Sequence, residues 1–422
     1  MSERVFVDRL APIGARLVAE LGSEAVFLHE PRAVEGALLE ATLRPSGGEA
    51  LADALRLLSE EALPALVRGG GTRLATANAP CRARVLLETQ ALGEPAEIDT
   101  DEGVGRFAAG AKLSALREAL AGSGWELPLD PPGRSTTLGG ALAAAAQGPR
   151  FASPRDVVLG LGVVLATGER IRCGGRVVKN VTGYDLAKLF VGSYGTLGVI
   201  EWAWLRLRPV PEATRVCVAP LGLGAEADAV ALAAARGPTV RAAALLDAVL
   251  YEGPLPADAA RALVVELAGD AAAVEQDAAV LASTAGASAA DDAAVEALRT
   301  AQAAGPLRVR VAALPTSLPA AAELLRAGGG AVLAYPARGL LWARFALEGP
   351  DDERGAERAL RAAKEAARAT HGVCLLEAAP LAARLGREVF SGAVATLALE
   401  RAVKRQYDPA GILNPGRFVG GL

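Results

Sequence analysis

Three glycine-rich polar segments, each beside a run of strand-forming residues, most constrain what this chain can fold into. They span residues 68–73 (RGGGTR), 131–140 (PPGRSTTLGG) and 179–200 (KNVTGYDLAKLFVGSYGTLGVI). Glycine weakens helix and strand interiors, so clustered glycines favour tight turns or a close approach of the backbone to another group. Consecutive glycines also let backbone N–H groups converge on an anion, because no Cβ stands in the way. Together the segments predict one extended ligand that carries a pyrophosphate and a flat ring.

Taken singly, each segment has a plainer interpretation. The first is neither a P-loop nor a dinucleotide fingerprint, because no Gly-Lys-Ser/Thr follows and Leu74 stands where a third glycine belongs. It is then a surface turn. The second is explained by a core helix with Thr136 or Thr137 as its N-cap. The third, taken alone, is a loop followed by a glycine-bounded strand.

Composition excludes several classes of protein. The 44 basic and 48 acidic residues give a net charge of −4, without the positive footprint that nucleic-acid binding needs. The four cysteines are far apart and form no CxxC pair, which favours free thiols in a reducing cytoplasm over disulfides or an Fe–S cluster. No uncharged apolar run approaches the roughly 18 residues of a membrane helix. We therefore expect a cytoplasmic protein without a transmembrane segment.

The texture of the sequence changes three times along its 422 residues, which are enough for two or three domains. Short apolar runs broken by glycine and proline alternate with amphipathic stretches up to about residue 211, and alanine-rich stretches follow. This mixture predicts the α+β class. The predicted units are a helical preamble at 1–36, a strand-rich domain at 37–211, a mixed α/β domain at 212–395 and a turn-rich C-terminal segment at 396–422.

The three segments, in this order, resemble the FAD-binding domain of the vanillyl-alcohol oxidase/PCMH superfamily, and YDPAGILNPGR near the end resembles its C-terminal return segment. The resemblance covers about 37–211 and 396–422. Within that superfamily, GGRVVKNVTGYDLAKL and GSYGTLG look most like the FAD-binding subunit of bacterial glycolate oxidase. The resemblance implies a PCMH-type two-subdomain FAD-binding domain, a mixed α/β cap domain and a C-terminal segment that returns to the FAD domain.

The resemblance also implies which residues bind FAD. Thr72 stands where some superfamily members carry the histidine that bonds covalently to flavin, so the implied FAD is non-covalent. The implied cofactor-binding residues are Gly69, Gly70, Gly71, Thr72, Arg73, Pro131, Thr137, Leu138, Gly139, Gly140, Lys179, Asn180, Tyr184, Asp185, Gly198, Val199, Ile200 and Asn414. A cation near the flavin ring stabilises its reduced anion, a role that Lys179 or Lys188 would fill; a solvated surface lysine is the alternative.

Catalytic residues are not identified by the sequence. Oxidation of a 2-hydroxy acid needs an acceptor for the hydroxyl proton and cations for the carboxylate. Related catalytic chains carry an HxGDGNxH-type motif and Glu in GSEGTLG, whereas this chain has Tyr194 there and only two histidines, His29 and His371. Besides Lys179, the weak candidates are His371 and Arg417, each with a structural or surface role as its alternative.

The missing histidine motif favours a supporting flavin subunit. We expect an FAD-dependent oxidoreductase that acts on the CH–OH group of 2-hydroxy acids as one subunit of a glycolate oxidase complex. A second, catalytic flavin subunit and an Fe–S subunit would be its partners, and these would provide any peripheral attachment to the inner membrane. The alternatives are a self-sufficient FAD-dependent D-lactate or 2-hydroxy-acid dehydrogenase, and an interaction protein that has lost FAD. The sequence does not decide whether the alanine-rich region 226–305 is an interface or a lid.

Overall fold

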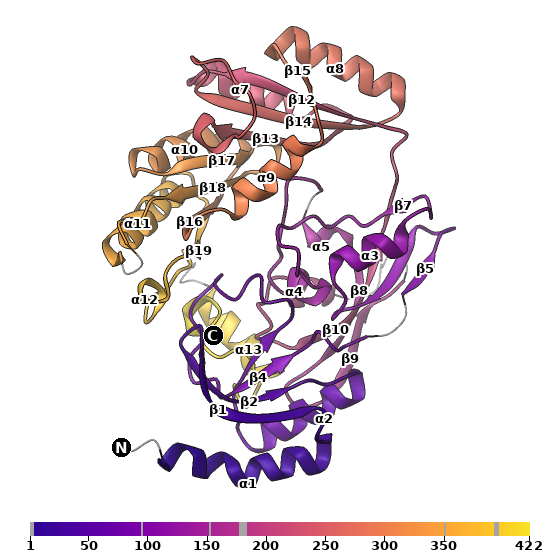
Figure 1. Cartoon of the computed structure of the whole chain (residues 1–422), viewed down its shortest axis with the longest axis vertical. Coiled ribbons are helices and arrows are strands. Elements are labelled where there is room, and N and C mark those ends of the chain that lie inside the picture. The colour runs from indigo at the N-terminus through magenta and orange to yellow at the C-terminus, as the bar shows by residue number, and fades with distance from the viewer. Residues whose placement is uncertain (1–3, 94–95, 152, 177–183, 350–351, 392–395) are drawn as a thin grey trace.

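The computed structural model describes residues 4–93, 96–151, 153–176, 184–349, 352–391 and 396–422, and three sheets organise them (Figure 1). The first sheet has the order β1-β2-β4-β3, with β1 antiparallel to β2 and the other pairs parallel. Its strands are β1 (Val26–Val34), β2 (Ala37–Leu43), β3 (Ala65–Arg68) and β4 (Val85–Glu88). Helices α1 (Arg4–Leu21) and α2 (Gly48–Glu60) cover it, and α2 buries Leu51, Leu55 and Leu58 on one stripe.

The segment 1–36, predicted as helical, is only partly so. After α1 the chain forms β1, which pairs with β2 from Val26 opposite Leu43 to Val34 opposite Ala37. The residues of β1 do not alternate between apolar and polar, because most of them are exposed, and Pro31 interrupts the strand, as is usual at a sheet edge. The strand was therefore not predicted.

The second sheet is antiparallel throughout and has the order β5-β6-β10-β8-β9. Its strands are β5 (Glu97–Asp99), β6 (Val104–Ala108), β8 (Val158–Val164), β9 (Arg170–Gly174) and β10 (Val199–Arg206). The helices of this part are α3 (Leu113–Leu120), α4 (Leu138–Ala143), α5 (Pro154–Val157) and α6 (Ala187–Phe190), and a short ribbon joins β7 (Trp125–Glu126) to β11 (Arg208–Pro209). Val164 and Val199 reach the core of the first sheet, so the two sheets share a hydrophobic contact.

The third sheet has eight antiparallel strands in the order β15-β12-β14-β13-β17-β18-β16-β19. They are β12 (Ala213–Leu221), β13 (Val240–Asp247), β14 (Arg261–Gly269), β15 (Ser288–Ala290), β16 (Leu307–Ala312), β17 (Ala331–Tyr335), β18 (Leu340–Phe345) and β19 (Val373–Ala378). Alternate residues of β12 enter different cores, Cys217 and Ala219 on one face and Val216 and Val218 on the other.

Helices cover both faces of the third sheet. One face packs against α7 (Ala225–Ala234), α8 (Ala271–Ala285), α10 (Leu318–Ala327) and α11 (Glu353–Ala369), and the other against α9 (Ala293–Ala303). Alanine allows close packing here: a Cβ on Gly328 at the end of α10 would lie 2.7 Å from the Cβ of Ala362 in α11. The predicted α+β class is confirmed.

The C-terminal part of the chain lies against the first sheet. It follows α12 (Leu381–Arg384) and includes α13 (Leu397–Tyr407). Beyond α13, Ala65 N donates to Ile412 O at 2.7 Å and Asn414 N donates to Ala65 O at 2.9 Å, so this segment runs parallel beside β3. Lys404 fixes its approach, because its ammonium donates to Asp408 Oδ2 at 2.6 Å and to the carbonyl oxygen of Leu413 at 2.9 Å.

Candidate functional site

The first two glycine-rich segments face each other at the end of β3. Thr137 is the N-cap of α4, and its Oγ1 accepts from Gly140 N at 3.3 Å and from Gly70 N at 3.4 Å. The hydroxyls of Thr72 and Thr136 lie 3.1 Å apart. The cap expected for a plain core helix is therefore present, and the same side chain also binds the first glycine segment.

Two glycines of the first segment admit no side chain. A Cβ on Gly70 would lie 1.6 Å from Ser135 O, and a Cβ on Gly69 would lie 2.3 Å from Thr137 Oγ1. Gly71 has a φ of +76°, which favours glycine. Bare backbone is thus required by the contact between the two segments, and Gly69, Gly70 and Gly71 line a cleft beside it. Runs of bare backbone of this kind are typical of anion-binding loops.

Asn414 joins the third segment to the first. Its Oδ1 accepts from Val67 N at 2.7 Å, and its Nδ2 donates to Tyr194 O at 2.7 Å. The residue is 3% exposed and has a φ of +44°. A Cβ on Gly195 would lie 2.8 Å from Asn414 Nδ2, so the glycine after Tyr194 makes room for this contact.

The structure brings eight of the eighteen predicted cofactor residues together in one cleft. The predicted residues that line it are Gly69, Gly70, Gly71, Thr72, Arg73, Thr137, Gly140 and Asn414, and Arg417, a weak catalytic candidate, lines it as well. The lining residues that sequence reasoning missed are Val67, Arg68, Leu74, Ala143, Ala144 and Tyr194. The signal for Tyr194 was its place inside GSYGTLG, where its backbone has a φ of +53°.

The remaining predicted residues that the structure describes do not line this cleft. Leu138, Val199 and Ile200 are buried in cores, and Gly198 contacts Val163 closely, since a Cβ there would lie 2.6 Å from Val163 Cγ1. Gly139 packs on β6 through its N–H, which donates to Ala109 O at 2.8 Å. Pro131, Tyr184 and Asp185 are likewise absent from the lining; Tyr184 is 94% exposed, and Asp185 lies 3.3 Å from the ammonium of Lys188. Lys179 and Asn180 lie outside the described residues.

The two further catalytic candidates lie in different places, since Arg417 lines the cleft and His371 does not. The guanidinium of Arg417 is buried and donates to the carbonyl oxygens of Leu74 at 2.7 Å and Thr76 at 2.9 Å. Burial lowers the pKa of Arg417 to about 10. These contacts hold the loop that follows RGGGT. His371 is exposed in the turn between α11 and β19 and lines none of the cavities described here.

A second cavity continues the cleft toward the third sheet, because Arg73, Ala144 and Tyr194 line both. Burial raises the pKa of the Tyr194 phenol and lowers that of the Arg73 guanidinium. Arg73 binds the two facing segments together by donating to Thr72 O at 3.0 Å and Pro132 O at 2.9 Å.

The far wall of the second cavity carries more cations than anions. Arg308 and Arg310 of β16 each lie 4.0 Å from the carboxylate of Glu377 on β19. Trp342 Nε1 donates to the same carboxylate at 2.8 Å. With Arg73 included, three guanidinium groups face one carboxylate, an excess of positive charge that suits a small organic anion. The sequence LRVRVA at 307–312 could have indicated this wall, because side chains alternate between the two faces of a strand and both arginines therefore lie on one face.

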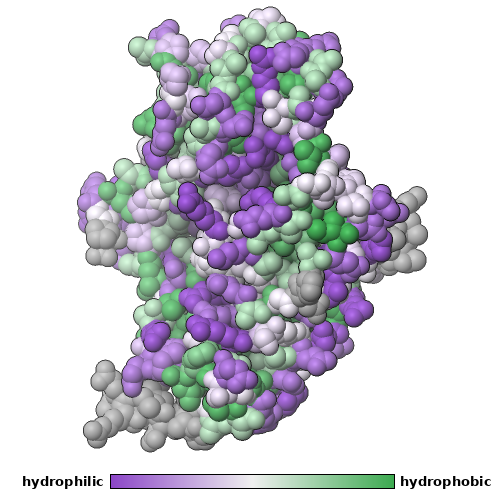
Figure 2. Space-filling model, turned by 45° about the vertical axis from the view of Figure 1, so that its right-hand side comes forward, coloured by the Kyte–Doolittle hydropathy of each residue, from purple (hydrophilic) through white to green (hydrophobic). Residues whose placement is uncertain are grey.

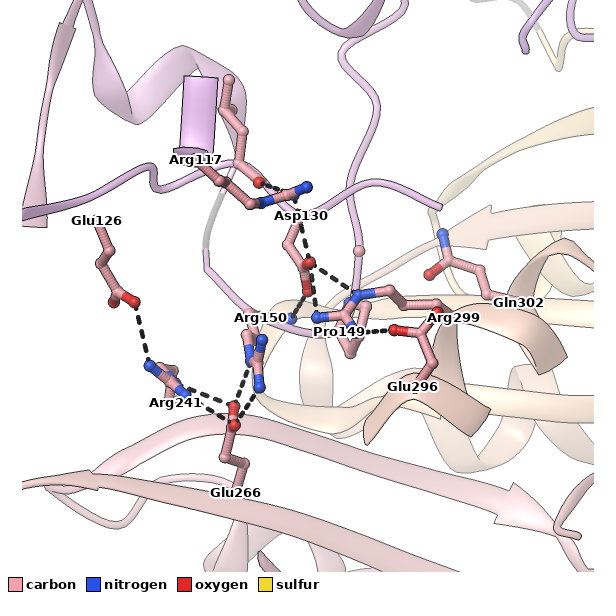
Figure 3. A network of polar contacts seen from close by, with 12 residues as sticks. Arg117, Glu126, Asp130, Pro149, Arg150, Arg241, Glu266, Glu296, Arg299 and Gln302 are labelled. Carbon is pink, nitrogen blue, oxygen red and sulfur yellow. Dashed lines mark hydrogen bonds and ion pairs between the residues drawn. The ribbon is translucent and has the colours of Figure 1, made fainter. Parts of the chain in front are cut away.

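Ion pairs hold the third sheet against the rest of the molecule (Figure 3). Glu266 of β14, 1% exposed, accepts from Arg150 at 2.7 Å and from Arg241 at 2.8 Å. Arg299 of α9 donates to Asp130 at 2.8 Å. On the face seen in Figure 2, hydrophilic side chains gather across the middle of the molecule. The network fixes the position of the cavity's far wall relative to the glycine segments.

Other kinds of site have no support in the described ranges. No group of three potential metal-ligating side chains occurs among the residues that the structure describes. None of the helices there has the length and apolar character needed to cross a bilayer. All four cysteines are free thiols, and Cys81 is the exposed one.

Comparisons with known proteins agree with this geometry. The FAD binding domain family matches residues 39–174, and the C-terminal domain of FAD linked oxidases matches residues 353–418. D-lactate dehydrogenase of Archaeoglobus fulgidus is 37% identical over 42% of this chain and 40% of its own length. Glycolate oxidase subunit GlcD of Bacillus subtilis is 33% identical over 43% of this chain and 39% of its length, and subunit GlcE of Escherichia coli is 43% identical over 25% and 31%. The matches thus span about two-fifths or less of these relatives.

The fold extends over the whole chain. The crystal structure of p-cresol methylhydroxylase superposes with a TM-score of 0.70 at 15% identity, covering 97% of this chain and 96% of that one. The predicted PCMH-type architecture and the FAD cofactor are confirmed by these matches. Residues 39–174 and 353–418 of the chain thus resemble FAD-linked oxidases, and the whole chain has the fold of p-cresol methylhydroxylase.

Proposed function

We propose that this chain is the FAD-binding subunit of a glycolate oxidase complex, which oxidises glycolate to glyoxylate with a second flavin subunit and an Fe–S subunit. The observation that carries the proposal is the cleft: glycine backbone, a cationic far wall, and neither histidine nor lysine among its described lining residues. Similarity to two subunits named for glycolate oxidase supports this assignment.

The cleft fits FAD by its chemistry. The backbone N–H groups of residues 69–72 would hold the pyrophosphate, since no Cβ fits at Gly69 or Gly70. Asn414 would keep the third segment against them. Thr72 has no nucleophilic imidazole, so the cofactor would be non-covalent. Bound FAD supplies the acceptor for hydride.

The positions of the two histidines favour a supporting role for this chain. His29, on β1, lies 3.1 Å from the hydroxyl of Thr42, and His371 lies in the turn after α11. Neither lines the cleft, so no imidazole there takes the proton of a substrate hydroxyl. A partner that carries such a base would complete the reaction.

The arginine wall favours a second candidate, a self-sufficient dehydrogenase of D-lactate or another 2-hydroxy acid. Arg73, Arg308 and Arg310 would bind the substrate carboxylate, and Glu377 would be the remaining acceptor for a proton. Burial lowers the pKa of Arg308, yet an arginine remains charged at neutral pH. Similarity to a D-lactate dehydrogenase supports this reading too.

One anaerobic experiment separates the candidates. The purified chain is expected to be yellow and to keep its flavin absorbance when glycolate or D-lactate is added. Adding the catalytic flavin subunit and the Fe–S subunit is expected to allow bleaching by glycolate. Bleaching by the chain alone would establish the second candidate. A colourless protein with no affinity for added FAD would defeat both and leave an interaction protein.

A further inference from the structure

The hydroxyl of Tyr194 is a polar group that the function proposed above does not use. Tyr194 is 8% exposed and lines both the glycine cleft and the second cavity. No described residue forms a hydrogen bond with this hydroxyl, whose oxygen stays accessible from the cavities. The ring is held in place by Phe390 and Phe418, with ring centroids 5.9 Å and 6.1 Å away. Because a buried tyrosine hydroxyl usually has a hydrogen-bond partner, this position is open for a ligand.

Arg310 of β16 also has hydrogen-bonding capacity to spare. Its guanidinium lies 4.0 Å from the carboxylate of Glu377, beyond hydrogen-bond distance, and makes no hydrogen bond to a described residue. The other two arginines of the cavity are occupied. Arg308 donates to backbone carbonyl oxygens at the end of α9, among them Ala303 O at 2.6 Å, and Arg73 donates to two backbone carbonyl oxygens. Arg310 is therefore the arginine whose donors are available inside the cavity.

The phenol of Tyr194 and the guanidinium of Arg310 face the same space. Both side chains line the second cavity, and β16 lies in Figure 1 on the side of the third sheet nearest to the C-terminal part of the chain. Burial raises the pKa of the Tyr194 phenol, and among the charges that act on the phenol that of Arg310 lowers this pKa most. Because burial prevails, the phenol stays protonated at neutral pH. A neutral O–H donor and a cation thus converge on one position.

Charge and size narrow the kind of ligand. The described lining carries three cations, Arg73, Arg308 and Arg310, against the single carboxylate of Glu377. Trp342 Nε1 donates to this carboxylate at 2.8 Å and holds it in place. The excess of positive charge attracts an anion and repels an amine. The cavity has a volume of about 20 Å³, little more than the roughly 10–15 Å³ that one water needs, so it takes the carboxylate group of a molecule whose remainder lies in the cleft.

We propose that the Tyr194 hydroxyl and the Arg310 guanidinium form a binding site for the carboxylate of a short 2-hydroxy or 2-oxo acid, whose second carbon extends into the glycine cleft. The choice of acid rests on the function proposed above, whereas the carboxylate site does not. Arg73 and Arg308 contribute positive charge while their donors stay with backbone carbonyl oxygens. Tyr194 and Arg310 would then select the acid that this chain holds, whether or not the chain oxidises it alone.

Oxamate is the probe, because it is a short monocarboxylate without a C–H bond that a flavin could oxidise. Isothermal titration calorimetry on the full, FAD-loaded chain is expected to show saturable binding of one oxamate per chain. Glycolamide, which is neutral and of the same length, is expected to bind about tenfold more weakly or worse, because it lacks the charge-assisted hydrogen bonds. Since no turnover is required, failure of this experiment is distinct from failure of the bleaching experiment that tests the proposed function.

Two variants locate the binding. Tyr194→Phe removes only the hydroxyl and is expected to weaken oxamate binding about tenfold, and Arg310→Met removes the cation and is expected to weaken it at least as much. Both variants should keep the flavin colour and the melting temperature of the parent chain, because the backbone oxygen of Tyr194, not its hydroxyl, holds Asn414. Tyr251→Phe and Arg361→Met, which alter residues outside both cavities, are the matched controls and should bind oxamate like the parent.

A third variant reverses the electrostatics of the site. Tyr194→Glu sets a second carboxylate near Glu377 and is expected to abolish oxamate binding. The proposal would be overturned by a lack of saturable binding to the parent chain, by equal binding of oxamate and glycolamide, or by parental affinity in any of the three variants.

Discussion

Replacing Gly70 by alanine adds one methyl group where the two glycine segments meet. The new Cβ would lie 1.6 Å from Ser135 O, whereas real Cβ contacts essentially never fall below 3.0 Å. The segments must therefore separate by at least 1.4 Å, the difference between these values. Because Ser135 O is backbone, no side-chain rotation relieves the contact. Such overpacking costs about 1–3 kcal/mol.

The separation also breaks the contact between Gly70 N and Thr137 Oγ1 and displaces the backbone of residues 69–72, on which the proposed FAD site depends. If about 2 kcal/mol of the cost falls on the complex, FAD binding weakens roughly 30-fold, because 1.4 kcal/mol is tenfold. Quenching of flavin fluorescence on titration measures this dissociation constant, and thermal unfolding measures stability. Gly175→Ala is the matched control, since no atom of the described residues lies within 4 Å of its added Cβ. Equal FAD affinity and equal melting temperature in Gly70→Ala and Gly175→Ala would refute the placement of these residues.

Three further substitutions test other parts of the structure. Glu266→Gln is expected to lower the free energy of unfolding by about 3 kcal/mol, because Arg150 and Arg241 lose a buried counter-ion. Denaturant unfolding measures this change, and Glu275→Gln, which alters an exposed carboxylate, is the control. Burial alone would raise the pKa of Glu266, but the hydrogen bonds from Arg150 and Arg241 outweigh it, and the pKa is lowered. The parent chain therefore loses this stabilisation as the pH falls through that pKa, whereas Glu266→Gln should not show that loss. Asn414→Ala leaves Val67 N and Tyr194 O without their side-chain partner and is expected to cost about 2 kcal/mol and weaken FAD binding, and wild-type thermal stability and affinity would contradict this. Lys179→Met is expected to lower the reduction potential of bound flavin without releasing it, as potentiometric titration would show, and an unchanged potential would remove Lys179 from that role.

The glycine segments were predictable because their requirement is local. Gly70 must be glycine wherever a backbone oxygen approaches its α-carbon, and clustering of such positions is visible in the sequence. The order of the segments then indicated the resemblance to PCMH-type FAD-binding proteins, whose fold the chain has. Thr137 was recognised both as a helix cap and as a ligand-side residue, and the structure shows one hydroxyl serving the helix and the first segment.

The rest depended on contacts between distant residues. Nothing in the sequence near Arg308 indicates that β16 pairs with β19, which is what sets Glu377 beside it. β1 went unrecognised because it is an exposed edge strand without alternation.

The parallel pairing of residues 412–414 with β3 has a consequence for biosynthesis. β3 is an edge of its sheet until that late segment arrives. At about 5–20 residues per second, a ribosome needs roughly 17–70 s to pass from residue 68 to residue 414. During that interval the nascent chain exposes an unpaired strand next to its unfinished cofactor pocket, a condition that invites intermolecular pairing. The glycine cleft is therefore expected to be complete only after residue 414 has been made, and overproduction that outruns folding is expected to yield aggregates of flavin-free protein.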